Sequence, residues 1–195
     1  MKRDVKSIEI AFVTHNKHKF VEASNLVSEW GINLVMIQLN KIELQASSLR
    51  DVAIHAAIEA YGHLKKPLIV EDAGLFIEAL NGFPGVYSSY TYSTIGVKGL
   101  TTLLIKERNR SAFFEAVVVY FDGKELKTFS GHVYGFILNK PIGKKGFGFD
   151  PIFSPKELFP KSFGQMSVRE KNKFSHRAQA FTAFAKWYTG SINYT

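Results

Sequence analysis

The sequence of 195 residues contains no cysteine. Disulfides, zinc–thiolate centres, iron–sulfur clusters and thiol nucleophiles are therefore excluded. It also has no run of about 18 uninterrupted apolar residues, so it predicts no transmembrane helix. The charged N-terminus is followed by neither a long apolar segment nor a small-residue cleavage site, which argues against a secretory signal. We expect a cytoplasmic protein without a membrane partner.

Length and composition indicate one ordinary globular unit. Domains contain about 150 residues, so we expect a single domain over residues 1–195. Lysine and arginine outnumber aspartate and glutamate by 25 to 17, a net charge of +8. Nine basic and three acidic side chains fall within residues 140–177, so this segment alone carries +6. A local anion site is therefore as plausible an explanation of the charge as a nucleic-acid-binding face.

The first half of the chain predicts alternating strands and helices. Apolar, β-prone runs at residues 8–14, 32–39 and 68–70 are expected to be strands. Apolar side chains recur at helical spacing over residues 16–31 and 48–64, where Asn16 and Ser48 are candidate N-caps. This order predicts an α/β sheet with covered faces.

The second half predicts antiparallel pairing. Residues 113–121 and 126–138 are rich in aromatic and β-branched side chains and are joined around Asp122-Gly123, a strong hairpin signal. A Gly/Pro/Lys-rich stretch follows over residues 139–165. A last helix is expected to carry on one face Phe174, Ala178, Phe181, Ala185 and Tyr188. The sheet should therefore be mixed.

Two polar segments lie next to the predicted strands. Residues 14–19 follow the first strand at a helix start, where backbone N–H groups attract anions; an ordinary N-cap with solvated lysines is the alternative. Glu71 and Asp72 follow the third strand, at the sheet edge where α/β proteins bind ligands. Carboxylates there suit Mg²⁺, with Glu43 as a further oxygen donor. A strand end that turns into solvent is the alternative for this acidic pair.

Two further segments combine glycines, aromatics and cations. Glycines flank Phe147, so the backbone can approach a ligand and Phe147 or Phe149 can stack on a base; a bend with core phenylalanines is the alternative. Lys171 and Arg177 are spaced so that both can reach one anionic ligand. His176 is a core histidine, a base-reading residue or a proton donor.

Taken in order, five motifs resemble the inosine triphosphate pyrophosphatase family, which acts on noncanonical purine nucleoside triphosphates. The resemblance covers nearly the whole chain. The motifs are Thr14-x-Asn16-x-x-Lys19, Glu71-Asp72-x-Gly74-Leu75, Gly82-x-Pro84-Gly85-x-Tyr87-Ser88, Gly146-x-Gly148-Phe149-Asp150-Pro151-x-Phe153 and Lys171-x-x-x-Ser175-His176-Arg177.

The resemblance implies Mg²⁺-dependent hydrolysis of ITP, dITP and XTP to the monophosphate and pyrophosphate, which cleanses the nucleotide pool. It implies an elongated α/β fold, a central mixed sheet flanked by helices with two lobes around an active-site cleft, and a homodimer. Asp72 is the catalytic candidate, and Glu43 and Asp72 belong to the metal site. The substrate-binding residues implied by the motifs are Thr14, Asn16, Lys19, Phe149, Asp150, Lys171, Ser175, His176 and Arg177.

Two alternatives compete with this hypothesis. A Maf-type nucleotide pyrophosphatase has similar architecture but prefers pyrimidine or modified nucleotides. A basic nucleic-acid-binding protein would use Phe147 and Phe149 for stacking and would bind oligonucleotides with a steep salt dependence. The second alternative leaves Glu43, Glu71 and Asp72 without a role, so we expect no nucleic-acid partner.

Overall fold

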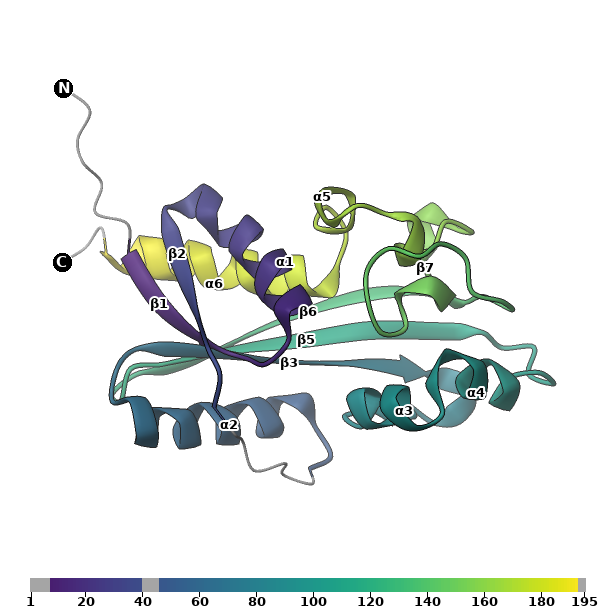
Figure 1. Ribbon diagram of the computed structural model, residues 1–195, viewed down its shortest axis with the longest axis horizontal. Helices are drawn as coiled ribbons and strands as arrows, with labels where there is room; N and C mark the ends of the chain where they lie inside the picture. The colour runs from purple at the N-terminus through teal and green to yellow at the C-terminus, as the bar shows by residue number, and fades with distance from the viewer. Residues whose placement is uncertain (1–7, 40–45, 193–195) are drawn as a thin grey trace.

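A single seven-stranded sheet runs through the molecule in the computed structural model, which describes residues 8–39 and 46–192 (Figure 1). Its strand order is β2-β1-β3-β5-β6-β7, and β4 pairs with β3. The strands are β1 (Ile8–Val13), β2 (Ile32–Ile37), β3 (Leu68–Ile77), β4 (Pro84–Gly85), β5 (Ser111–Phe121), β6 (Leu126–Ile137) and β7 (Phe153–Pro155).

The pairing directions confirm the mixed sheet. Strand β1 runs parallel to both β2 and β3, whereas β4 and β5 pair antiparallel with β3, β6 with β5, and β7 with β6. The predicted hairpin joins β5 to β6, and there Asp122 accepts hydrogen bonds from the backbone N–H groups of Lys124 and Glu125. Gly123 supplies the positive φ that this turn requires.

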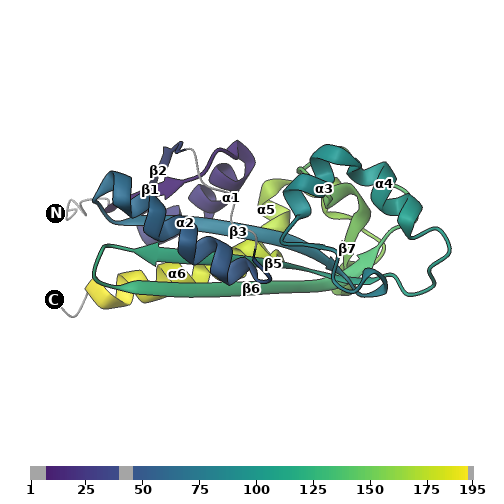
Figure 2. The same ribbon diagram turned by 90° about the horizontal axis from the view of Figure 1, so that it is seen from below.

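Helices flank the sheet on both faces, and Figure 2 shows that the molecule is elongated along its long strands. The helices are α1 (Lys17–Val27), α2 (Leu49–Leu64), α3 (Ser88–Thr94), α4 (Gly96–Leu103), α5 (Val168–Lys171) and α6 (His176–Ile192). In Figure 1, α1 and α6 lie above the sheet and α2 lies below it, while α3 and α4 lie at the far end. Within the described part of the chain, none of the helices is long and apolar enough to cross a membrane.

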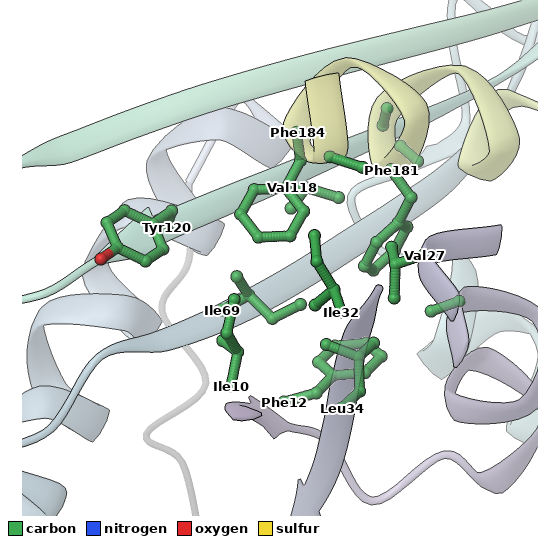
Figure 3. Packing of buried hydrophobic residues seen from close by; sticks show 14 residues of the cluster. Ile10, Phe12, Val27, Ile32, Leu34, Ile69, Val118, Tyr120, Phe181 and Phe184 are labelled. Atoms are coloured by element: carbon green, nitrogen blue, oxygen red, sulfur yellow. The ribbon is translucent and has the colours of Figure 1, made fainter. Parts of the chain in front are cut away.

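The buried core lies between these layers. On the upper face, Phe12 of β1 and Val118 of β5 pack with Phe181 and Phe184 of α6 (Figure 3). On the opposite face, alanines of α2 such as Ala53 pack against neighbouring strands. The small side chains of α2 let this helix lie close to the sheet, on the face opposite to that covered by α1.

Strand β3 is longer than the sequence predicts. The apolar run predicts a strand that ends at Val70, but β3 extends from Leu68 to Ile77 and pairs with β5 along this whole length. Glu71 and Asp72 therefore lie inside the strand rather than beyond its end.

The last helix begins later than expected. Ser175 Oγ accepts a hydrogen bond from the N–H of Ala178 and so caps α6, which begins at His176 and leaves Phe174 outside. Lys171 belongs to the separate short helix α5.

Candidate functional site

The site lies where β1 stops and β3 continues. The parallel pairing of these strands ends at Val13 and Val70, and β4 joins β3 only at Leu75 and Phe76. On this side of β3, residues 71–74 have no partner strand among the described residues, whereas β5 pairs with them on the other side. The chain crosses from β1 through α1 to β2 on one face of the sheet and returns from β2 through α2 to β3 on the other face, so the strand order reverses between β1 and β3. Such a reversal is a topological switch point, where open α/β sheets bind ligands.

The loop after β1 is held by its own side chains. Asn16 caps α1, as predicted, and its Oδ1 accepts hydrogen bonds from the N–H groups of His18 (2.9 Å) and Lys19 (3.1 Å). The N–H of Asn16 in turn donates to Thr14 Oγ1 at 3.1 Å. Lys19 Nζ lies 2.9 Å from Glu71 Oε2 and 4.0 Å from Asp72 Oδ1. The structure thus brings Thr14, Asn16, Lys19 and Asp72 together at one edge.

Asp72 and Glu71 point to opposite faces of the sheet, because successive strand residues alternate. The Asp72 side chain is 28% exposed, and its Oδ1 accepts the N–H of Ala73 at 3.0 Å. The Glu71 side chain is fully buried. Glu43, the second predicted metal ligand, lies outside the described residues.

A buried ion network connects the other predicted residues. Lys171 Nζ lies 2.8 Å from Glu22 Oε1 and 2.7 Å from Asp150 Oδ2. Arg177 contacts the second oxygen of Glu22 at 2.6 Å, and its Nε and Nη2 donate to Glu71 Oε1 at 3.1 and 2.9 Å. All five side chains are at most 4% exposed, so the network joins α1, β3, α5 and α6 through charges shielded from water.

The carboxylates of the network experience opposing effects. Burial alone raises the pKa of Glu22 and of Glu71, but nearby cations outweigh burial and hold both pKa values below the ordinary range. Arg177 acts on both groups, with Lys171 beside Glu22 and Lys19 beside Glu71. For Asp150, burial prevails over Lys171 and the pKa is raised.

Glu22 is the member of the buried network that the sequence analysis missed. The spacing of Lys171 and Arg177 predicts that both reach one anionic ligand, and in the structure both contact the carboxylate of Glu22. The available signal was weak: an acid three residues after Lys19, among the apolar positions that α1 turns toward the sheet. Its ion-pair partners lie 149 and 155 residues further along the chain.

The two phenylalanines of the glycine-rich segment differ in exposure. Phe149 is 3% exposed, lies in a hydrophobic cluster, and has its ring edge-to-face with Tyr92. Phe147 is half-buried, and its ring centroid lies 4.8 Å from Lys171 Nζ and 5.5 Å from Arg177 Cζ. Phe147 therefore presents the more accessible ring beside the network, and base stacking by Phe149 stays a prediction.

Ser175 and His176 are buried at the start of α6. Ser175 serves as the N-cap, and the ring of His176 stacks on Phe114 with 4.8 Å between centroids. Burial, together with the positive charges of Arg177 and Lys171, holds the pKa of His176 well below 6.5, so the ring is neutral at pH 7. Its Nδ1 has no hydrogen-bond partner within the described part of the chain.

A cavity of about 240 Å³ opens beside the network. It is lined by Glu22, Lys145, Gly146, Met166, Ser167, Val168 and Lys171. The residues at the edge of β3 do not line it, so the cavity and the switch point are separate parts of the surface around the network.

Comparison with known proteins places this geometry in a family. A relative from Hyperthermus butylicus, named dITP/XTP pyrophosphatase, is 46% identical over 91% of this chain and 93% of its own length. A relative of the same name from Thermococcus kodakarensis is 44% identical over 92% of this chain and 97% of its own.

Solved structures of Ham1 proteins are also similar to this chain. The Ham1 protein of Staphylococcus aureus has a TM-score of 0.80, and a HAM1 protein from Coxiella burnetii has one of 0.82. Each is 28% identical and covers 94% of this chain and 99% of the other. The model of the Ham1 family matches residues 10–187. The chain belongs to the Ham1 family.

Proposed function

We propose that this protein hydrolyses noncanonical purine nucleoside triphosphates, namely dITP, XTP and ITP, to the monophosphate and pyrophosphate. The observation that carries the proposal is the position of Lys19 between Glu71 and Asp72 at the switch point, in a chain whose relatives are named dITP/XTP pyrophosphatase. The Maf-type alternative receives no support from the family match.

The chemistry requires a water to attack the α-phosphorus while pyrophosphate leaves. Negative charge grows on the leaving group, and a fixed cation stabilises it. Lys19 supplies positive charge on one side of the crevice, beside the N-terminus of α1 that Asn16 caps. Asp72 faces the crevice from β3, where it is placed to orient the water and accept its proton.

We propose that the reaction depends on Mg²⁺, held by Asp72 and Glu43. The donor chemistry fits: Mg²⁺ takes only one or two carboxylates and completes its shell with water and phosphate oxygens. No group of three or more potential metal ligands occurs among the residues that the structure describes, so a site made only of protein ligands finds no support there. When bound, the ion would neutralise phosphate charge and lower the pKa of a bound water.

Base recognition is proposed for the residues around Phe147. Phe147 offers its half-buried ring to the purine. His176, at the N-terminus of α6, is one of the residues expected to read the edge of the purine, and its Nδ1 has no hydrogen-bond partner among the described residues. A site that donates to a 6-oxo group leaves donors facing the amino group of adenine, which costs about 1–3 kcal/mol for each mismatch. The N–H groups of Arg177 already donate to Glu22 and Glu71, so this residue would act through the network it holds.

We also propose a cytoplasmic homodimer. A nucleotide-cleansing enzyme works where the nucleotide pool is, which supports the location. Exposed apolar side chains at the far end of the sheet support self-association, since Tyr90 of α3 is 68% exposed and Leu103 of α4 is 52% exposed. Light scattering after size-exclusion chromatography tests the dimer.

The experiment that tests the proposed function is pyrophosphate release from dITP, XTP, ITP, ATP, GTP and dTTP, with and without Mg²⁺. We expect Mg²⁺-dependent turnover of the first three and kcat/KM values at least about tenfold lower for ATP and GTP. Inactivity on every purine would refute the proposed function. Preferential turnover of dTTP would favour the Maf-type alternative.

A further inference from the structure

The imidazole of His18 lies flat against the ring of Phe147. The ring centroids are 5.2 Å apart and the planes differ by 14°. His18 belongs to the first turn of α1, whereas Phe147 belongs to the glycine-flanked segment before β7, so the contact joins distant parts of the chain. The roles proposed above for the site residues do not account for this contact between His18 and Phe147.

The two rings are held differently. The N–H of Phe147 donates to Asp150 Oδ2 at 2.9 Å, and its ring lies close to Lys171 and Arg177. His18 is exposed, and only its backbone N–H takes part in capping α1, through Asn16. Phe147 is therefore the fixed ring, and the His18 side chain can rotate away without breaking the helix cap.

We propose that His18 is a specificity-determining residue that closes over the purine, so that the base lies between His18 and Phe147. The inference rests on the proposed function. A planar base needs about 3.5 Å to each neighbouring ring, or roughly 7 Å between the two side chains. The present stack is tighter, so His18 moves outward when a base enters and then covers its second face.

This arrangement gives His18 a role distinct from phosphate binding. Stacking depends on the area and polarizability of the base, so a second ring favours large purines without reading their edges. Loss of one aromatic contact lowers affinity about two- to tenfold. The phosphates would be held as before, since Asn16 and Lys19 make their contacts independently of the His18 ring.

Three variants test the proposal: His18→Ala, His18→Phe, and His63→Ala, which alters an exposed histidine near the end of α2. We expect His18→Ala to raise KM for XTP and dITP about two- to tenfold, with kcat changed less than about twofold. His18→Phe should restore the wild-type KM, and His63→Ala should leave it unchanged. Inhibition by inorganic tripolyphosphate, which has no base, should be the same in all four proteins.

Binding of IMP, measured by calorimetry, provides a readout that does not depend on turnover. We expect weaker binding by His18→Ala and wild-type binding by His18→Phe. The proposal is overturned if His18→Ala binds IMP and XTP normally, if His18→Phe behaves like His18→Ala, or if tripolyphosphate inhibition weakens in parallel. It is equally overturned if the wild-type protein binds no IMP. A wild-type protein that binds IMP through His18 but releases no pyrophosphate would refute the proposed function alone.

Discussion

Arg177 and Glu71 form an ion pair that solvent does not reach. The Nε and Nη2 atoms of the guanidinium lie 3.1 and 2.9 Å from the same carboxylate oxygen, and the side chains are 2% and 0% exposed. The pair ties the last helix, α6, to the strand that carries Asp72. Because the charges cannot be solvated, each one depends on its partner. The two sides of the proposed site are therefore held in one geometry.

Removing one partner of this pair should be costly. Glu71→Ala leaves the Arg177 guanidinium buried with Glu22 as its remaining carboxylate, and we expect the free energy of unfolding to fall by about 3–5 kcal/mol. Arg177→Met should destabilise similarly, because it leaves both carboxylates with less compensation. Urea denaturation measures both effects.

The double variant decides whether the pair acts as a unit. Glu71→Ala combined with Arg177→Met should lose less stability than the sum of the single changes, because the second change removes the charge that the first leaves unpaired. Strictly additive losses would contradict this. Glu157→Gln, at an exposed acid, should change stability by less than about 0.5 kcal/mol.

The pH dependence of stability should carry a contribution from His176. The pKa of His176 in the folded protein is well below 6.5. As the pH falls below 6.5, His176 therefore becomes protonated in the unfolded chain while it stays neutral in the folded protein. The free energy of unfolding should therefore fall as the pH falls from about 7 toward 5.5, by up to about 1.4 kcal/mol per pH unit. Urea denaturation across this range measures the slope.

His176→Phe keeps a ring against Phe114 and removes the titrating group, so its slope over this range should be shallower. His63→Gln, at an exposed histidine, should keep the wild-type slope. An unchanged slope in His176→Phe would show that other groups cause the pH dependence.

Gly74, two residues after Asp72, is required by a close approach of two strands. A Cβ at Gly74 would lie 2.4 Å from the carbonyl oxygen of Gly85 and 2.9 Å from its carbonyl carbon. Since the obstacle is backbone, β4 must shift, and we expect Gly74→Ala to destabilise the protein by about 1–3 kcal/mol. Thermal unfolding measures the loss.

Gly62→Ala provides the matched control. Gly62 lies within α2, and a Cβ there meets nothing within 4 Å. Alanine in a helix is favoured over glycine, so this variant should gain up to about 1 kcal/mol. Equal effects of the two substitutions would contradict a steric role for Gly74.

Local signals were enough to predict most elements of the fold. Apolar periodicity and the caps Asn16 and Ser48 correctly located the first two helices, since both signals lie within the segment itself. The second half of β3 could not be found in this way, because Asp72, Ala73 and Gly74 are poor strand formers. They adopt a strand because β5 pairs with them, which is a property of the tertiary structure.

The same limit applies to the candidate site. The β1 loop and the β3 acids could be placed together, because the parallel pairing of β1 with β3 puts the residues after Val13 beside those after Val70. Glu22 could not be recognised, because a buried acid in a helix looks like a surface acid until its distant cations are known. The unequal burial of Phe147 and Phe149 likewise arises from packing that two neighbouring phenylalanines do not reveal.

Asp72→Asn separates the chemistry from the fold. The substitution keeps the size of the side chain and an oxygen that can accept the N–H of Ala73, and it removes the negative charge proposed to bind metal and orient water. We expect kcat on dITP or XTP to fall on the order of a hundredfold or more. Pyrophosphate release at saturating substrate measures this loss.

The fold should survive the substitution, because Lys19 keeps its 2.9 Å ion pair with Glu71 whereas its distance to Asp72 is already 4.0 Å. The side chain of Asp72 is also partly exposed, so stability should change by less than about 0.5 kcal/mol. Glu157→Gln, the same type of change at an exposed acid, should retain wild-type turnover. Near-normal turnover of Asp72→Asn would remove Asp72 from the proposed metal and water site, and a collapse in stability would assign it a structural role instead.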